Sequence, residues 1–376
     1  MRFLLTCAGT AGHINPAIAV ADRLKMLKPD AAFLFVGSGR TLENRLIPAA
    51  GYEIENITIS GFSRGFSPKK IGENLKTLRN LAVSARQCRR IIQSFKPDVV
   101  IGTGGYVCYP VLKAASGQKI PTVLHESNAV PGLTTKMLSS IADRIMVAFP
   151  EVSQYYRHPE RVVVTGTPVR GGFCMLSKDE ARRKLGITDP RPIVVSFWGS
   201  LGASAMNEMM ADFIQLNCAS GAFCHIHATG GGEDGLLAMQ ERLRLRNIVE
   251  LPAFEDLRAY IDDMDTVMAA ADLVLCRAGA STMAELTAMG MPAILVPSPN
   301  VTNNHQEKNA RQLGSAGGAV VLLESECSGR KLYDTAAGLI REPEKLEKMS
   351  AAQKKMGVPD ACGKITDVIL GLMNEI

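Results

Sequence analysis

The sequence predicts an α/β protein of two Rossmann-like domains, each built on a doubly wound parallel sheet. Three observations support this fold class. The chain has 376 residues, a length that suits two domains of ordinary size. Short apolar segments alternate with amphipathic segments of helical period, which is the pattern of parallel strands joined by helices. Finally, the order of strands and glycine turns in the first half recurs in the second half.

The first half begins with a strand over 2–7, a glycine turn, a helix from about 15 to 28 and a strand over 32–36. The same alternation continues through helices over 41–50, 69–94, 109–115 and 133–141, and through strands over 98–101, 122–124, 144–147 and 162–165. Because these strands are short, nearly continuous apolar runs, we expect a parallel sheet covered by helices on both faces.

The second half repeats this arrangement after residue 170. Its expected helices are 178–185, 203–216, 236–243, 264–270, 282–289 and 304–313, and its expected strands are 193–197, 222–228, 273–276, 293–296 and 319–322. The Gly-x-x-Gly spacing of Gly9–Gly12 returns at Gly199–Gly202, and the segment 98–105 matches 272–279. Two similar domains facing each other would place a ligand cleft between the carboxyl ends of their strands.

The charge of the chain is modest overall but concentrated in one segment. Lysine and arginine total 42 and aspartate and glutamate total 37, a net charge of +5. Between Phe62 and Lys96 there are nine basic residues and one acidic residue, interleaved with Phe66 and leucines. Such a surface suits an anionic membrane face. The alternatives are an ordinary solvated helix face and a nucleic-acid surface, but no nucleic-acid motif accompanies the charge, and we expect no nucleic-acid partner.

Cysteine usage indicates a reducing compartment and no metal. The nine cysteines are scattered and form no C-x-x-C pair. His225 and His227 invite comparison with a metal site, but their spacing fits one face of a strand, and the acidic run at 262–265 fits a helix cap. We therefore expect neither a bound metal nor a cofactor.

Three glycine turns at strand ends point to phosphate binding. Gly9–Gly12, Gly102–Gly105 and Gly199–Gly202 each follow an apolar strand and precede a helix, where backbone N–H groups can contact phosphate. Tight turns without a ligand are the alternative. The chain lacks a G-x-x-x-x-G-K-[ST] motif, and no acidic residue ends the second strand to hold an NAD ribose. A nucleoside diphosphate carrying something other than nicotinamide fits better.

Polar residues at the same strand ends are candidates for chemistry. His13 follows the first glycine turn, where the positive end of a helix favours neutral imidazole, the form a general base needs. His125, Glu126 and Asn128 follow the strand over 122–124, although they could equally hold a turn by side chain–backbone hydrogen bonds. Glu285, on the helix after Gly279, could accept both hydroxyls of a ribose, or it could simply interact with the helix dipole.

Longer motifs carry a family resemblance. In order from residue 8 to residue 310 they are AGTAGHINPAIAVA, GTGGYVCYP, HESNAVPGLTTKMLSSIADRI, GTPVR, GSLGASAMNE, YIDDM, DLVLCRAGASTMAELTAMGMPAILVP and HQEKNA. They resemble the peptidoglycan N-acetylglucosaminyltransferases of glycosyltransferase family 28. Ala8 and Ala11 replace glycines of the family pattern, and Leu201 and His305 replace frequent glutamines.

This resemblance implies a GT-B fold with a first domain over 1–168, a second over 169–353, and a last helix within 354–376 that packs back on the first. It implies that UDP-N-acetylglucosamine contacts Thr10, Gly12, Asn128, Arg170, Ser200, Ile261, Ala280, Thr282, Glu285, His305 and Gln306. Ile261 would meet the uracil through its backbone, and Asn128 would face the sugar. The acceptor diphosphate would contact Gly9, Gly12, Gly104, Gly105, Tyr106, His125 and Glu126. His13 would be the catalytic base for the muramoyl 4-hydroxyl.

The implied reaction is an inverting transfer of N-acetylglucosamine to undecaprenyl-diphospho-muramoyl-pentapeptide, at the cytoplasmic face of the membrane and without a metal. The resemblance implies a peripheral enzyme that docks on an anionic membrane surface through segment 62–96. Two alternatives share the fold and the donor: another UDP-sugar-dependent GT-B transferase, and a UDP-N-acetylglucosamine epimerase. A sensor that binds the nucleotide sugar without turnover is a third possibility, from a different functional class.

Overall fold

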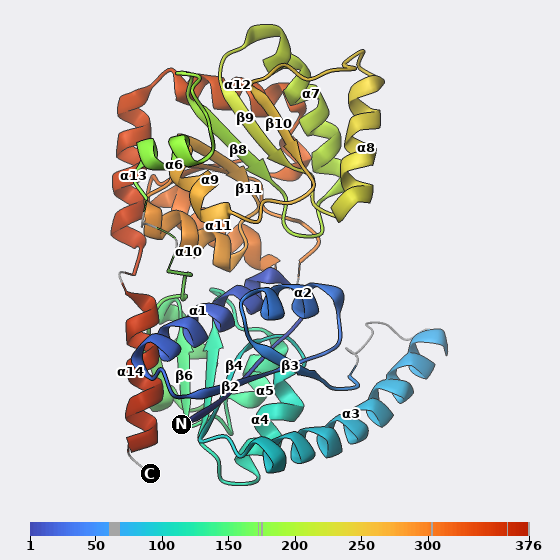
Figure 1. The fold of residues 1–376 in the computed structure, drawn as a ribbon, viewed down its shortest axis with the longest axis vertical. Helices are drawn as coiled ribbons and strands as arrows, with labels where there is room; N and C mark the ends of the chain where they lie inside the picture. Colours follow the sequence, from blue (N-terminus) through green and yellow to red (C-terminus); the bar gives the residue numbers. More distant parts are fainter. Residues whose placement is uncertain (60–67, 172, 174–175, 302–303, 359, 375–376) are drawn as a thin grey trace. The chain divides into compact units, whose positions relative to one another are not determined.

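The computed structural model describes residues 1–59, 68–171, 173, 176–301, 304–358 and 360–374, with backbone only at 68–79 and 81. These residues form two compact units (Figure 1). Unit 1 comprises Met1–Arg170 and Asp360–Ile376, and unit 2 comprises Gly171–Pro359. The sequence prediction placed the two divisions at 168/169 and 353/354.

Unit 1 contains a 7-stranded parallel sheet in the order β3-β2-β1-β4-β5-β6-β7. Its strands are β1 (Arg2–Cys7), β2 (Ala32–Gly37), β3 (Glu53–Asn56), β4 (Val99–Gly104), β5 (Thr122–Glu126), β6 (Arg144–Val147) and β7 (Val162–Val164). Its helices are α1 (Ala11–Leu27), α2 (Thr41–Ala49), α3 (Pro68–Phe95), α4 (Cys108–Ser116), α5 (Leu133–Leu138), α14 (Ala361–Asn374) and the short 3-10 helices η1 (Pro150–Tyr155) and η2 (Pro159–Arg161).

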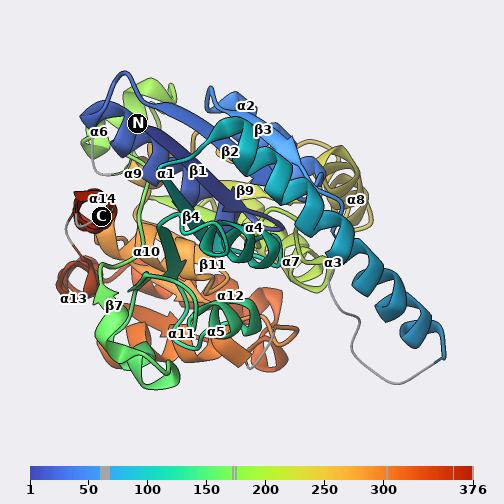
Figure 2. The same cartoon turned by 90° about the horizontal axis from the view of Figure 1, so that it is seen from below.

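Helices cover both faces of this sheet, as predicted. Alternate residues of β1 point to opposite faces, so Phe3 and Leu5 join one core with residues of α1 and α14, while Leu4 joins the other core with residues of α3 and α4. Figure 1 shows α1 beside α14, and Figure 2 shows α3 lying along α4.

Unit 2 repeats the arrangement with a 6-stranded parallel sheet in the order β10-β9-β8-β11-β12-β13. Its strands are β8 (Ile193–Phe197), β9 (Cys224–Ala228), β10 (Glu255–Arg258), β11 (Leu273–Cys276), β12 (Ala293–Leu295) and β13 (Ala319–Val321). Its helices are α6 (Lys178–Lys184), α7 (Ser204–Ser220), α8 (Gly232–Arg244), α9 (Met264–Ala270), α10 (Ala280–Met289), α11 (His305–Ser315), η4 (Glu324–Glu326), α12 (Gly329–Ile340) and α13 (Pro343–Met356).

Both sheets therefore have the doubly wound Rossmann-like order that the sequence predicts. The order reverses between β1 and β4 in unit 1 and between β8 and β11 in unit 2. Ligands of such sheets bind beyond the carboxyl ends of the strands at this reversal. In unit 1 those ends carry the first two glycine turns, and in unit 2 they carry the third glycine turn and Gly279.

The structure corrects three element predictions. Helix α1 begins at Ala11 rather than near residue 15, with Pro16 inside the helix, so His13 belongs to the first turn of α1. The edge strands β3 and β10 and the helix α12 were not predicted. A single helix over about 354–373 is wrong at its start, because α13 continues to Met356 and α14 begins at Ala361, where the Asp360 carboxylate accepts a hydrogen bond from the Gly363 N–H (3.0 Å).

Candidate functional site

The first two glycine turns lie against each other in unit 1. Gly105 has a φ of +87°, and a Cβ there would stand 2.6 Å from the Ala8 carbonyl oxygen, so only glycine allows this approach. Gly102 has a different role, because a Cβ there would lie 2.9 Å from Leu112 Cδ1 beneath α4. Thus Gly104 and Gly105 face the first turn, whereas Gly102 serves helix packing.

His13 is held where the two turns meet. A Cβ on Gly104, whose φ is +125°, would stand 2.3 Å from His13 Nδ1, so the imidazole rests against the glycine backbone. The Thr103 hydroxyl donates to the His13 carbonyl oxygen (2.7 Å). Thr10 is the N-cap residue of α1, and its side chain makes no cap hydrogen bond. The predicted catalytic base and the predicted phosphate-binding turns therefore share one small region of unit 1.

The predicted cluster lies at the carboxyl end of β5 and just after it, and it divides into the buried strand residues His125 and Glu126 and the half-buried amide of Asn128. His125 is buried, with Nε2 at 2.9 Å from the Gly166 carbonyl oxygen and Nδ1 at 3.3 Å from Ser127 Oγ, and burial lowers the pKa of its imidazole. The Glu126 carboxylate accepts hydrogen bonds from the Asn128 backbone N–H and side-chain amide (3.0 and 2.9 Å). In this structure Glu126 shapes the turn and orients Asn128.

The third glycine turn, Gly199–Gly202, lies in unit 2 and packs against a second glycine-rich segment at 229–232. The Ser200 carbonyl accepts a hydrogen bond from the Gly231 N–H (3.2 Å). A Cβ on Gly230 would lie 2.3 Å from the Gly202 nitrogen, and a Cβ on Gly202 would lie 2.4 Å from the Thr229 carbonyl oxygen. The run at 229–232 was not singled out in the sequence, yet it fixes the predicted diphosphate turn.

Helix α10 supplies the other predicted donor contacts. Gly279 is the N-cap residue of α10, and Ala280 and Thr282 lie in the first turn of the helix. Glu285 lies one turn further along at a half-buried position, and desolvation raises the pKa of its carboxyl to about 8. Carboxyl groups whose pKa is raised by desolvation occur often at functional sites.

The remaining predicted donor residues lie in both units. Ile261 is buried, and the Gln306 side-chain oxygen accepts a hydrogen bond from the Ser298 N–H (2.9 Å). His305 begins α11. Arg170 is the last residue of the first segment of unit 1, the unit that also holds Thr10, Gly12 and Asn128, whereas Ser200, Ile261, Ala280, Thr282, Glu285, His305 and Gln306 belong to unit 2.

Sequence reasoning missed Arg277, which joins three strand ends of unit 2. Its guanidinium donates to the Val296 carbonyl oxygen (3.0 Å), forms an ion pair with Glu324 (2.5 Å) and lies 5.9 Å from the centre of the Trp198 ring. Trp198 directly precedes the Gly199–Gly202 turn, and Arg277 directly follows β11, three residues before α10 begins at Ala280. The sequence feature that could have identified Arg277 is a basic residue placed between a buried strand and a glycine.

The histidine pair of β9 belongs to a buried hydrogen-bond network rather than to a metal site. Ser196 Oγ lies 2.8 Å from His225 Nε2 and 2.7 Å from His227 Nδ1. His225 Nδ1 lies 2.8 Å from Glu255 Oε2, and the Asn217 amide donates to Glu255 Oε1 (2.6 Å). Among the described residues, no group of three or more side chains of metal-binding type is found.

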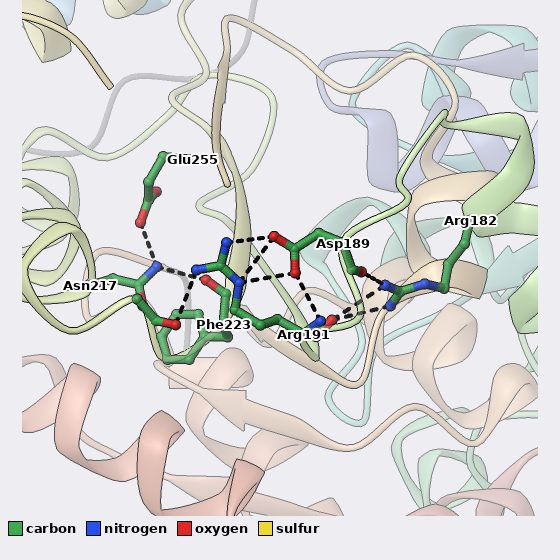
Figure 3. Close-up of polar contacts among 7 residues, drawn as sticks. Arg182, Asp189, Arg191, Asn217, Phe223 and Glu255 are labelled. Atoms are coloured by element: carbon green, nitrogen blue, oxygen red, sulfur yellow. Dashed lines mark hydrogen bonds and ion pairs between the residues drawn. The ribbon is translucent and has the colours of Figure 1, made fainter. Parts of the chain in front are cut away.

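Figure 3 shows Asn217 and Glu255 together with an ion pair at the start of β8. Arg191 pairs with Asp189 and donates to the Gly221 carbonyl oxygen (3.1 Å), while Arg182 donates to the carbonyl oxygens of Asp189 and Arg191. These contacts lie near the amino ends of the strands, opposite the glycine turns. We interpret them as structural.

Replacing Asn217 with alanine is expected to destabilise unit 2 by about 1–3 kcal/mol, because Glu255 Oε1 and the Phe223 carbonyl each lose a buried donor. A lower midpoint of urea-induced unfolding, with an unchanged dependence of the unfolding free energy on urea concentration, would show this. The matched control is Gln215→Ala on the same helix, whose exposed amide donates to the Arg246 carbonyl and whose loss should cost less than about 0.5 kcal/mol. Equal midpoints for the two variants would contradict the assignment.

The fold and the site together define a class: two Rossmann-like domains with nucleotide-type glycine turns, as in GT-B glycosyltransferases. The family model for the glycosyltransferase family 28 N-terminal domain matches residues 3–147, and that for the C-terminal domain matches residues 193–365. The chain belongs to glycosyltransferase family 28.

Individual relatives agree with this assignment. A protein of Acetivibrio thermocellus named UDP-N-acetylglucosamine--N-acetylmuramyl-(pentapeptide) pyrophosphoryl-undecaprenol N-acetylglucosamine transferase is 43% identical over 100% of this chain and 99% of its own length. A protein of the same name from Caldanaerobacter subterraneus is 41% identical over 98% and 99%. The crystal structure of Acinetobacter baumannii MurG matches with a TM-score of 0.70 and 26% identity, covering 99% of this chain and 100% of that one.

One further structure shows how widely the fold is shared. The complex of Staphylococcus aureus MnaA with UDP matches with a TM-score of 0.71 at 14% identity, over 100% of this chain and 97% of that one. This likeness concerns the fold alone. The GT-B fold predicted from the sequence is confirmed.

Proposed function

We propose that this chain transfers N-acetylglucosamine from UDP-N-acetylglucosamine to the muramoyl 4-hydroxyl of undecaprenyl-diphospho-muramoyl-pentapeptide, a step of peptidoglycan synthesis. The observation that carries the proposal is full-length identity of about two residues in five to relatives named for this transfer. The juxtaposition of His13 with two glycine turns in unit 1, and of a glycine turn with α10 in unit 2, supplies the chemistry that such a transfer needs.

The proposed step is a single displacement with inversion. His13 takes the proton of the 4-hydroxyl as its oxygen attacks the anomeric carbon of the donor sugar. The bond from that carbon to the diphosphate oxygen breaks, and UDP leaves with the electron pair. The amino end of α10 and the amides of the Gly199–Gly202 turn stabilise the charge that develops on the departing diphosphate.

The acceptor-dependent release of UDP tests this proposal. Purified protein is incubated with UDP-N-acetylglucosamine, with and without a lipid-linked muramoyl-pentapeptide diphosphate, and UDP is measured over time. We expect release only when the acceptor is present. Binding of the nucleotide sugar without acceptor-dependent release would favour a sensor instead.

We propose that the reaction needs no metal and no cofactor, because backbone amides and helix ends can balance the leaving diphosphate by themselves. Exhaustive treatment with EDTA is therefore expected to leave kcat within about twofold of the untreated value, a change of only some 0.4 kcal/mol in barrier. A large loss of activity that Mg²⁺ restores would contradict this.

We further propose that the protein is peripheral and docks on the anionic cytoplasmic face of the membrane through segment 62–96. The exposed guanidinium groups of Arg86, Arg89 and Arg90 lie on the carboxyl-terminal half of α3. Other basic residues of this segment, including Arg64, Lys69, Lys70, Lys76 and Arg79, lie outside the described side chains. Among the described residues, no helix is both long and apolar enough to cross a bilayer.

Charge reversal of Lys69, Lys70 and Lys76 to glutamate is expected to abolish sedimentation with vesicles that contain phosphatidylglycerol, because each basic residue near an anionic surface contributes about 1 kcal/mol. The control reverses three exposed lysines of unit 2: Lys331, Lys345 and Lys348. If both triple variants bind vesicles like the unmodified protein, segment 62–96 is not the docking surface.

A further inference from the structure

The loop between β2 and α2, Ser38–Arg40, is held by a buried carboxylate of α2 that has no role in the site described so far. Glu43 is fully buried on α2. Its Oε1 accepts hydrogen bonds from the Ser38 hydroxyl (2.9 Å), the Arg40 backbone N–H (3.2 Å) and the Ser38 N–H, and its Oε2 accepts one from the Gly9 N–H (3.2 Å). A buried carboxylate is costly unless it has such donors, so the four bonds define one arrangement of the loop.

The bond to Gly9 ties this loop to the first glycine turn. Gly9 adopts a φ of +97°, and a Cβ on it would have no heavy atom within 4 Å, so one side of the turn is open. Its N–H donates to Glu43 Oε2 (3.2 Å). Gly9 was predicted to contact the acceptor diphosphate, but its amide instead fixes the position of the turn relative to Ser38–Arg40.

Arg40 reaches the second glycine turn from the same loop. Its guanidinium carbon lies 5.4 Å from the centre of the Tyr106 ring, and its side chain is exposed. Tyr106 follows Gly105, whose backbone rests against the Ala8 carbonyl beside the first turn. Thus the Arg40 backbone is bound through Glu43 to the first turn, and its side chain lies on the second.

A guanidinium within about 6 Å of an aromatic ring is attracted to the ring electrostatically, and its N–H groups can still bind a phosphate. The two glycine turns offer backbone amides, which carry only partial charges, whereas a diphosphate carries full negative charges. A cation beside both turns complements the amides, and arginine binds phosphate oxygens with paired hydrogen bonds.

We infer that Arg40 is a further acceptor-binding residue, which contacts the diphosphate of the lipid-linked acceptor, and that Glu43 is the positioning residue that holds it there. This inference rests on the proposed function. It concerns the acceptor alone, so it predicts an effect on the KM for the acceptor and none on the KM for UDP-N-acetylglucosamine.

The test measures both KM values for Arg40→Ala with a water-soluble, short-chain muramoyl-diphosphate acceptor and no membrane. Loss of a charge-assisted contact should raise the acceptor KM about tenfold to a hundredfold, with Arg40→Lys intermediate. Lys28→Ala is the control, because Lys28 is an exposed lysine at the far end of α1. With an acceptor whose diphosphate is replaced by an uncharged linker, Arg40→Ala and the unmodified protein should behave alike.

Glu43→Gln tests the positioning role. It should raise the acceptor KM while leaving the donor KM unchanged, and adding Arg40→Ala in that background should cost less than in the unmodified protein. If the acceptor KM of Arg40→Ala equals that of the unmodified protein, the inference is wrong while the proposed function stands. The same holds if Arg40→Ala raises the KM for the uncharged acceptor as much as it raises the KM for the diphosphate acceptor. If the unmodified protein shows no acceptor-dependent turnover, both fail.

Discussion

Replacing His13 with alanine is expected to lower kcat by a factor of about 10²–10⁴, the usual contribution of a general base. The imidazole lies against Gly104 at the meeting point of the first two glycine turns, which places it beside the predicted acceptor diphosphate. The hydrogen bond from the Thr103 hydroxyl should be retained in the variant, because it goes to the His13 carbonyl oxygen rather than to the ring. Steady-state kinetics with saturating substrates measure the effect.

The donor dissociation constant separates loss of a base from loss of a binding residue. It should be unchanged in His13→Ala, as determined by calorimetric titration with UDP-N-acetylglucosamine. His158→Ala serves as the control, because His158 is a partly exposed histidine of unit 1 that pairs with exposed Glu160. Turnover in His13→Ala equal to that of the control would show that another group takes the proton.

Replacing Glu285 with glutamine is expected to weaken donor binding by about a hundredfold at pH 8.5. A carboxylate can accept both ribose hydroxyls, and hydrogen bonds to a charged group contribute about 1.5–3 kcal/mol each. The amide keeps the size of the side chain but offers a single acceptor. Calorimetric titration of both proteins with UDP-N-acetylglucosamine measures the difference.

Glu285 also predicts that donor affinity depends on pH. Desolvation raises the pKa of its carboxyl to about 8, so the group is mostly protonated at pH 6.5 and must lose its proton to accept both hydroxyls. Affinity should therefore rise with pH, by up to about tenfold per unit, and level off above pH 8. Glu285→Gln should remove this dependence. A flat profile in the unmodified protein would refute the ribose role.

The regions that the sequence predicted well are those whose pattern is local. Buried parallel strands are apolar runs, and the glycine turns that follow them are visible without a structure. The missed strands β3 and β10 have the sequences EIEN and EDLR, because each lies at a sheet edge and packs on one neighbour only. The start of α1 was misplaced by four residues, because the helix begins at Ala11, inside the segment predicted as a glycine turn, and continues through Pro16.

Site residues show the same division. His13 and Glu285 could be predicted as candidates because each lies shortly after a glycine at the end of an apolar strand. Glu43 and Arg277 were missed because their roles depend on contacts with loops distant in sequence, such as the bond between Glu43 and Gly9, 34 residues away. His125, which lies within β5, shows a contact that the local pattern does not reveal, because its Nε2 is 2.9 Å from the Gly166 carbonyl oxygen, 41 residues away.

The product formed from UDP-N-acetylglucosamine and the lipid-linked acceptor tests the central proposal most directly. Mass spectrometry and NMR of that product should show one added N-acetylglucosamine, joined to the muramoyl 4-oxygen with the anomeric configuration inverted relative to the donor. Retention of configuration, attachment at another oxygen, or conversion of the nucleotide sugar to its C2 epimer with the acceptor unchanged would contradict the proposed function.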